Sequence, residues 1–326
     1  MGEARARRRA SGLALAVASA LCFGGSGPVA RPLLEAGLDP LHVTWLRVAG
    51  AALLLVPLAV RHRRVLRTHP ALLLAFGALP MAGVQAFYFA AINRIPVGVA
   101  LLIEFLGPVL VLAWVRLVRR RPVSRAAVVG VVLAVGGLSC LLEVWAGVRL
   151  DAAGLLLALG AMVCQAAYFL LGDAAGDDVD PMAVVAYGAL IGAVLISAVA
   201  APWTLPWQRL AGSVEVAGAT VPAAACVVWL ALVTTALAYA TGVGAIRRLT
   251  PMVAGAVAYL EVVTAIVLAW LLLGEALTPP QALGAVIVVA GAFVAQRAVP
   301  APAPAPPDQG SGPAGRGGAS AGAVRG

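Results

Sequence analysis

The sequence contains no lysine, and all 23 of its basic residues are arginine. This absence excludes a phosphate-binding P-loop, because the lysine of that motif reaches the terminal phosphates of a nucleotide. It also excludes covalent catalysis through a lysine Schiff base, and with it pyridoxal enzymes and retinal-linked pumps. Any chemistry of this chain therefore depends on other groups.

Cysteine and histidine are scarce, and neither is arranged to hold a metal ion. A disulfide framework or a zinc site needs closely spaced thiols, whereas the cysteines lie singly inside apolar runs, at Cys22, Cys140, Cys164 and Cys226. The histidines lie at the ends of apolar runs or among arginines, at His42, His62 and His69. We therefore expect no metal site and no other cofactor.

Charged residues make up only 11% of the chain, whereas 62% of its residues are hydrophobic and the mean hydropathy is +0.98. Soluble domains are about 45–50% apolar and about 25% charged. No soluble fold buries this proportion of apolar side chains, so the lipid bilayer is the expected surroundings for most of the chain. The composition predicts a polytopic membrane protein.

Ten apolar runs follow one another along the chain, and a membrane crossing takes roughly 20 residues. The runs are 11–29, 41–60, 71–92, 97–115, 126–142, 152–171, 182–201, 221–243, 252–273 and 280–295. The arginines before the first run resemble the start of a signal peptide, but the nine later runs favour its retention as a membrane span. We predict an all-α integral membrane protein with ten transmembrane helices.

The arginines gather at the N-terminus and in alternate loops between the apolar runs. Because loops rich in arginine stay in the cytoplasm, both termini are predicted to be cytoplasmic and the protein to lie in the inner membrane. The net charge of +9 then reflects membrane orientation, and no nucleic-acid partner is expected. Residues 1–10 form a basic N-terminal segment, and the Pro/Ala/Gly-rich residues 299–326 are predicted to be a disordered tail.

The two halves of the sequence, residues 11–150 and 151–298, resemble each other. The stretch 40–47 matches 181–188, 13–22 matches 155–164, and 112–114 matches 268–270, in the same order along the chain. Five spans per half is an odd number, so the second half enters the membrane from the opposite side. Such inverted repeats are typical of secondary transporters, which open a central site alternately to each side.

Three ionisable residues fall inside the apolar runs, namely Arg47, Glu104 and Glu261. Ionisable groups at this depth are energetically costly and mark functional sites by default. We expect all three to face a central cavity, where they bind a substrate or carry the coupling proton. Arg47 and Glu104 would either neutralise each other or receive the carboxylate and the ammonium group of a zwitterion. The alternative is that Arg47 extends towards the membrane surface and that Glu104 is an uncharged packing residue.

Other residues are weaker candidates for the same cavity. Tyr88, Tyr168 and Pro108 are candidates to line a substrate path, and packing against lipid or other helices is the alternative. Glu275 and Thr278 lie at a turn between two apolar runs, for which a structural role is expected. There, Thr278 is placed to cap the last helix, because two prolines follow it.

Several motifs resemble the EamA family of the drug/metabolite transporter superfamily. In the second half these are Tyr259-Leu-Glu-Val-Val and Leu273-Gly-Glu-Ala-Leu-Thr, with Gly284 and Ala290-Gly291 beyond them. In the first half, Ile95-Pro-Val-Gly-Val-Ala-Leu-Leu-Ile-Glu-Phe-Leu-Gly-Pro108 looks like the threonine/homoserine exporter branch. The resemblance implies ten helices in two inverted five-helix repeats around a central cavity, with Arg47 and Glu104 at family positions.

The resemblance also implies export of small amino acids or related polar metabolites by alternating access, driven by protons. The expected partners are the bilayer, a small-molecule substrate and protons. Efflux of amphipathic drugs is the alternative within transport. From another class, an intramembrane enzyme acting on lipids is disfavoured, because the sequence contains no His-Glu-x-x-His or Gly-x-Ser-x-Gly motif. We therefore expect no enzymatic activity.

Overall fold

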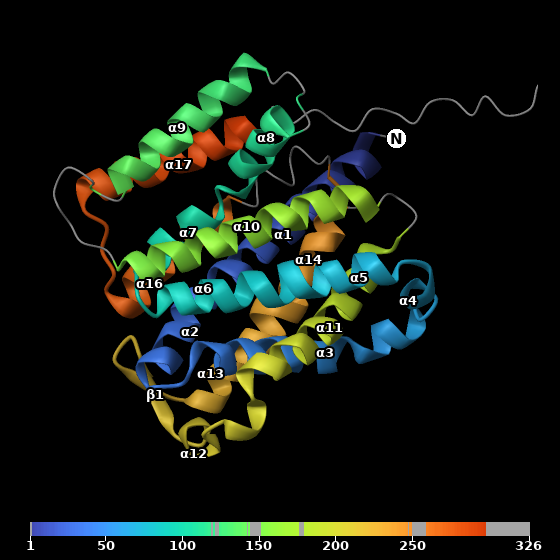
Figure 1. Ribbon diagram of the computed structural model, residues 1–326, viewed down its shortest axis with the longest axis vertical. Coiled ribbons are helices and arrows are strands. Elements are labelled where there is room, and N and C mark those ends of the chain that lie inside the picture. The colour runs from blue at the N-terminus through green and yellow to red at the C-terminus, as the bar shows by residue number, and fades with distance from the viewer. Residues whose placement is uncertain are drawn as a thin grey trace, which may run out of the picture.

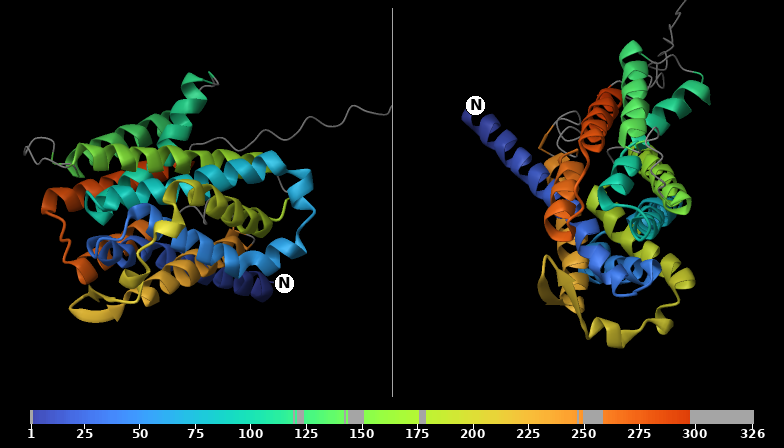
Figure 2. Two further views of the ribbon diagram at one scale, coloured as in Figure 1. Left: turned by 60° about the horizontal axis from the view of Figure 1, so that its bottom comes forward. Right: turned by 90° about the vertical axis from the view of Figure 1, so that its left-hand side faces the viewer.

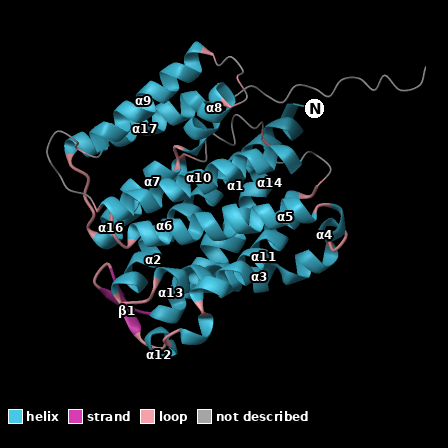
Figure 3. Ribbon diagram, viewed as in Figure 1, coloured by secondary structure: helices cyan, strands magenta, loops and turns pink. Residues whose placement is uncertain are grey.

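Helices account for nearly all of the computed structural model (Figure 3). It describes residues 2–118, 120, 124–141, 143, 151–175, 179–246, 248–249 and 259–297. The predicted C-terminal tail, 299–326, lies outside the described residues, and so does the beginning of the ninth apolar run, 252–258. The basic N-terminal segment is helical from Gly2 onward, and the right-hand view of Figure 2 shows the N-terminal end of this first helix projecting from the rest of the molecule.

The first half of the chain forms α1 (Gly2–Gly24), α2 (Ser26–Glu35), α3 (Pro40–Arg61), α4 (Val65–Thr68), α5 (Pro70–Phe76), η1 (Gly77–Gly83), α6 (Val84–Ile92), α7 (Val97–Glu104), α8 (Gly107–Leu117) and α9 (Arg125–Leu141). The second half forms α10 (Ala152–Ala175), α11 (Pro181–Ala200), η2 (Pro202–Thr204), α12 (Trp207–Leu210), β1 (Ser213–Val216), β2 (Ala219–Pro222), α13 (Ala223–Ala231), η3 (Leu232–Leu237), α14 (Ala238–Ile246), α16 (Leu260–Leu273) and α17 (Pro279–Arg297). Of the η elements, η2 is a 3₁₀ turn, whereas η1 and η3 are π-helical.

Six helical segments of the described residues are long and apolar enough to cross a membrane, and four shorter apolar helices accompany them. The long segments are Ala10–Glu35, Pro40–Arg61, Pro70–Ile92, Val97–Trp114, Pro181–Ala200 and Ala223–Ala245. Many large apolar side chains on these and the shorter helices are exposed, including Leu53, Val132, Val194 and Val286. An exposed apolar surface of this extent is unfavourable in water and is the surface that lipid covers.

The helical segments over the first and fourth apolar runs are each interrupted within the span, a detail that was not predicted from the sequence. The first run is interrupted at Gly25, between α1 and α2. The fourth is interrupted at Phe105 and Leu106, between α7 and α8. There, Pro108 lacks the N–H group that a continuous helix would offer to the carbonyl of Glu104. Backbone groups and helix ends are thereby released in the middle of the bundle.

The helices α3 and α11 begin in the same way. Asp39 precedes Pro40, and its side chain accepts the N–H of Leu41 at 2.8 Å. Asp180 precedes Pro181 at the start of α11, and its side chain accepts the N–H of Met182 at 2.9 Å. Both starts combine an aspartate cap with a proline in the first turn, two features that favour the beginning of a helix.

The helices α3 and α11 pack against each other in opposite directions. Near the start of α3, the indole N–H of Trp45 donates to Ser197 Oγ near the end of α11, at 2.8 Å. Near the start of α11, the hydroxyl of Tyr187 donates to the carbonyl of Ala59 near the end of α3, at 2.7 Å. The two similar helix starts therefore lie at opposite ends of the molecule.

The helices α9 and α17 lie side by side, apart from most of the bundle (Figure 1). Their contact runs through glycines. A Cβ atom on Gly137 would lie 2.6 Å from the backbone nitrogen of Val288, and one on Gly284 would lie 2.5 Å from the backbone nitrogen of Leu141. The missing side chains let the two backbones touch, as small residues do between membrane helices.

We expect Gly137→Ala to destabilise the protein by about 1–3 kcal/mol, because the added methyl group meets backbone that cannot move aside. Gly136 provides a matched control one residue away, since a Cβ atom there meets nothing within 4 Å. Thermal unfolding of the two variants in the same detergent measures the difference. Equal melting temperatures for both variants would contradict a backbone contact between α9 and α17.

A β-hairpin between α11 and α13 was not predicted from the sequence. β1 and β2 pair antiparallel, from Ser213 opposite Pro222 to Val216 opposite Ala219. The two turn residues, Ala217 and Gly218, both have positive φ values, of 52° and 76°, which is the conformation of a type I′ turn. The helix of the predicted eighth span, 221–243, begins at Ala223, because the first two residues of that run belong to β2.

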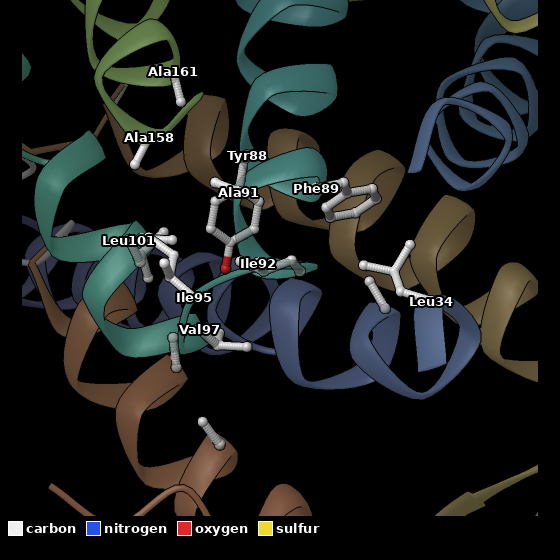
Figure 4. Packing of buried hydrophobic residues seen from close by; sticks show 14 of the residues in the cluster. Leu34, Tyr88, Phe89, Ala91, Ile92, Ile95, Val97, Leu101, Ala158 and Ala161 are labelled. Carbon is white, nitrogen blue, oxygen red and sulfur yellow. The ribbon is translucent and has the colours of Figure 1, made fainter. Parts of the chain in front are cut away.

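The largest buried cluster of apolar side chains lies where α2, α6 and α7 meet. Figure 4 shows Tyr88 and Phe89 of α6 among Leu34 of α2 and Val97 and Leu101 of α7. These contacts fix the positions of α6 and α7 relative to α2. Each of these three helices also carries a polar residue of the site described next.

Candidate functional site

A small cavity lies inside the bundle, and polar residues from both halves of the chain line it. Its volume is about 30 Å³, and its lining consists of Phe23, Ser26, Arg47, Gln85, Tyr88, Leu101, Glu104 and Glu261. A volume of this size holds roughly two water molecules. A ligand larger than a few water molecules therefore requires the surrounding helices to move apart.

Arg47 is the most deeply buried charged residue of this cavity, with 2% of its surface exposed. Its Nε donates to Thr235 Oγ1 at 2.7 Å, and its Nη2 donates to the backbone carbonyl of Thr234 at 2.9 Å. Its Nη1 donates to Gln85 Oε1 at 2.6 Å and also to Ser26 Oγ. Four oxygen atoms from three other helical segments thus hold the guanidinium group in one orientation.

All four acceptors around Arg47 are uncharged. In the part of the chain that the structure describes, no carboxylate oxygen lies within 4.0 Å of its guanidinium nitrogens. The ring of Phe89, 5.4 Å from the guanidinium carbon, adds a cation–π contact. The hydrogen bonds reduce the cost of burying the positive charge, and the carboxyl groups of Glu104 and Glu261, which line the same cavity, do not pair with it directly.

Glu104 is the last residue of α7 and is 6% exposed. Its Oε2 atom is buried and accepts no hydrogen bond from the described residues. The carboxyl end of a helix carries a partial negative charge, which disfavours an anion there. A buried carboxyl oxygen without a donor, at this end of a helix, is suited to receive a proton or the ammonium group of a ligand.

Glu261 reaches the same cavity from the second half of the chain. It lies in the first turn of α16 and is partly exposed. The partial positive charge of the helix N-terminus stabilises a carboxylate at this position. The two carboxyl groups therefore differ in their surroundings, although both line one cavity with Arg47.

Of the weaker cavity candidates, only Tyr88 is among the residues that line the cavity. Tyr168 packs instead against Phe76, with ring centroids 5.7 Å apart. Pro108 lies in the first turn of α8, and its side chain falls outside the described residues. Tyr88 is close to Gly27 of α2, where a Cβ atom would lie 2.3 Å from the tyrosine hydroxyl oxygen. The glycine thus makes room for this side chain.

Glu275 and Thr278 lie outside the cavity, in the turn between α16 and α17. Glu275 Oε2 accepts the N–H of Val97, the first residue of α7, at 2.9 Å, and Oε1 lies 4.0 Å from Arg31 Nη1. Burial raises the pKa of Glu275 above its usual range, and the N–H of Val97 and the charge of Arg31 oppose this effect. This contact connects the turn to the end of α7 opposite Glu104.

Thr278 precedes α17 and exchanges hydrogen bonds with Gln281. Its Oγ1 accepts the N–H of Gln281 at 3.4 Å, and Gln281 Oε1 accepts the N–H of Thr278 at 3.1 Å. This reciprocal pair is a capping box. The Thr278 hydroxyl also donates to Glu143 Oε1, near the end of α9.

The neutral partners of Arg47 were not predicted from the sequence. These partners are polar residues that lie within apolar runs, namely Ser26, Gln85, Thr234 and Thr235. Their position within apolar runs is the one sequence signal by which they could have been found. Metal chemistry has no support in the described residues, where no group of three histidine, cysteine or acidic side chains is placed to hold a metal ion.

Comparison with known proteins matches both halves of the chain to one family. The sequence profile described as "EamA-like transporter family" matches residues 10–142 and again residues 152–296. The threonine/homoserine exporter RhtA of Escherichia coli strain K12 is 35% identical over 276 residues, which cover 84% of this chain and 87% of that protein. The protein of the same name from Salmonella typhimurium strain LT2 is 34% identical over 256 residues, covering 77% and 80%.

One solved structure, titled only "Crystal structure of protein", has the same fold. It superposes with a TM-score of 0.58 at 21% sequence identity, over 89% of this chain and 97% of that chain. Agreement over nearly the whole of both chains supports the helix arrangement described above.

Proposed function

Because this chain belongs to the EamA-like transporter family, we propose that it is a secondary transporter that exports threonine, homoserine or similar small amino acids. The relatives named as threonine/homoserine exporters match it over most of their own length. The observation that carries the proposal is the cavity in which, among the described residues, Arg47 has no directly paired carboxylate and Oε2 of Glu104 accepts no hydrogen bond.

A zwitterionic amino acid offers the charge that each of these groups lacks. The carboxylate of the substrate binds Arg47, whose guanidinium is surrounded by neutral acceptors. The ammonium group binds Glu104, whose Oε2 has no partner among the described residues, or Glu261 on the other side of the cavity. Charge-assisted hydrogen bonds of this kind are stronger than neutral ones, and they favour substrates that carry both charges.

The chain crosses the membrane ten times, in two inverted five-helix repeats, according to this proposal. Two observations support the repeats: the family profile matches twice, and α3 and α11 begin alike at opposite ends of the molecule. Transporters built in this way open a central site by moving one repeat against the other. Alternating access would also enlarge the cavity, which is too small for an amino acid as it stands.

Proton coupling in this proposal depends on the cavity carboxyl groups. A proton and the ammonium group of a substrate compete for Glu104, so that entry of one accompanies release of the other. The protein lies in the inner membrane with both termini on the cytoplasmic side, as the arginine distribution indicates. Protons that move into the cytoplasm then drive the amino acid out of it.

Uptake by proteoliposomes that contain the purified full chain tests the proposal. We expect accumulation of labelled threonine and homoserine when a pH gradient is imposed, and no accumulation in liposomes without protein. A labelled lipophilic cation is the second substrate in the same vesicles. Uptake of the cation without uptake of either amino acid would overturn the proposal in favour of drug efflux.

A further inference from the structure

The helix formed by α13, η3 and α14 contains a π-helical segment in its middle, from Leu232 to Leu237. π-helical turns are rare and occur frequently at functional sites. In this segment Thr234 and Thr235 are both buried, and both hydroxyl groups donate to the carbonyl of Leu230 at 2.9 Å. With its hydrogen committed to Leu230, the hydroxyl oxygen of Thr235 is an acceptor for a second group.

That second group is Arg47. Its Nε donates to Thr235 Oγ1 at 2.7 Å, and its Nη2 donates to the carbonyl of Thr234 at 2.9 Å. One edge of the guanidinium group is therefore held by consecutive residues of the π-helical segment. The remaining nitrogen, Nη1, lies on the side of Ser26 and Gln85, both of which line the cavity.

The first half of the chain contains a second π-helical segment, η1, which lies between α5 and α6 and contacts α11. It has no hydroxyl residues, and its neighbours on α11 include two glycines and Ile191. A Cβ atom on Gly192 would lie 3.1 Å from the carbonyl of Gly77, and one on Gly188 would lie 2.7 Å from the ring of Phe76. In the matched stretches 40–47 and 181–188, Gly188 stands where α3 has Arg47.

The difference between η1 and η3 separates residues that a π-helical segment needs for packing from residues that serve the cavity. A π-helical segment can pack against its neighbour through glycine and apolar residues, as η1 does with Gly188, Ile191 and Gly192 of α11. The two threonines of η3 and the arginine that they hold are therefore not required by this type of helix contact. The threonines belong to the second half of the chain and the arginine to the first, and they meet on the side of the cavity.

We propose that Thr235 is a positioning residue, which fixes the orientation of Arg47 so that its charge faces the substrate carboxylate and selects for it. The inference rests on the proposed amino-acid export and adds to it the source of carboxylate specificity. Thr235 acts through its hydroxyl oxygen, and the carbonyl of Thr234 provides the second acceptor. Without the hydroxyl, Nε loses its acceptor, and the orientation of the guanidinium group is held by three acceptors instead of four.

Transport of threonine and of threoninamide, which lacks the carboxylate, tests this inference. For Thr235→Val we expect the KM for threonine to rise about tenfold and the maximal rate to stay within about twofold of that of the unaltered chain. A raised KM at a nearly constant maximal rate indicates the loss of an interaction that stabilises the ground state and the transition state equally. We expect the preference for threonine over threoninamide to fall by a similar factor. Thr235→Ser, which retains the hydroxyl, is expected to restore both values.

Thr241→Val is the matched control, because the hydroxyl of Thr241 donates to the carbonyls of Leu237 and Ala238 in the same helix. Its KM and its substrate preference are expected to equal those of the unaltered chain. If Thr235→Val does not accumulate in the membrane, Thr235→Ala replaces it with the same expected values, since alanine also lacks an acceptor and favours a helix.

The possible outcomes separate this inference from the proposed function. An unaltered chain that transports no threonine overturns the proposed function, and the inference with it. Threonine transport by the unaltered chain, with an unchanged KM and preference in the Thr235→Val or Thr235→Ala variant, overturns the inference alone. A Thr235→Ser variant with the same raised KM as Thr235→Val also overturns it, because the effect would then not depend on the hydroxyl.

Discussion

Substitution of Arg47 by glutamine is expected to reduce threonine uptake at low substrate concentration by at least about 30-fold. Removal of one partner from a desolvated charge pair costs about 2 kcal/mol or more, and each 1.4 kcal/mol is about a factor of ten. Arg47→Lys is expected to recover little, because an ammonium group cannot reach the several acceptors that the guanidinium engages. Initial uptake rates in proteoliposomes measure both effects.

Arg94 supplies the matched control for Arg47. Its side chain is half exposed, and its Nη1 lies 3.4 Å from Oδ2 of Asp151, whose side chain is exposed to a similar extent. Exposed ion pairs contribute little, so Arg94→Gln is expected to transport threonine within about twofold of the unaltered chain. An Arg47→Gln protein that elutes as a single folded species and transports as well as Arg94→Gln would remove Arg47 from the substrate site.

Replacement of Glu104 by glutamine is expected to abolish the response of transport to a pH gradient. One pH unit corresponds to 1.36 kcal/mol per proton, so one-for-one exchange of a proton for an amino acid supports about tenfold accumulation. Glutamine resembles glutamate in shape but takes up no proton, and the variant is therefore expected to accumulate no threonine. The ratio of internal to external labelled threonine, with and without the gradient, measures the effect.

Glu215 is the control for this experiment, because it is exposed on strand β1. Glu215→Gln is expected to accumulate threonine like the unaltered chain. Full accumulation by Glu104→Gln would instead assign proton coupling to another group, and Glu261 is then the next carboxyl group to test, since it lines the same cavity.

The sequence was most informative where a single physical rule decided the outcome. Long apolar runs predict helices in lipid, and the helices lie close to the predicted runs. The cost of burying charge drew attention to Arg47, Glu104 and Glu261, and these three side chains line one cavity although residues 47 and 261 belong to different halves. The apolar runs and the ionisable residues within them can both be recognised from residue type and position in the sequence alone.

Features that depend on contacts between distant residues were not predictable. Arg47 and Thr235 are separated by 188 positions, so no local pattern associates them. The π-helical segment η3 contains no proline or glycine that would mark it in the sequence, whereas Pro80 within η1 is a local signal of an interrupted helix. The β-hairpin has only Ala217-Gly218 as a turn signal, with alanine in a conformation that it rarely adopts.

The glycine contact between α9 and α17 has a consequence for how such a molecule can rearrange. Side chains that interdigitate can change rotamers and settle into a second packing, whereas two backbones in direct contact have no torsions with which to do so. The pair is therefore expected to keep one register in every conformation and to serve as the stationary axis between the two halves. Distances measured by spin labels across α9 and α17 should stay constant while those across the cavity change.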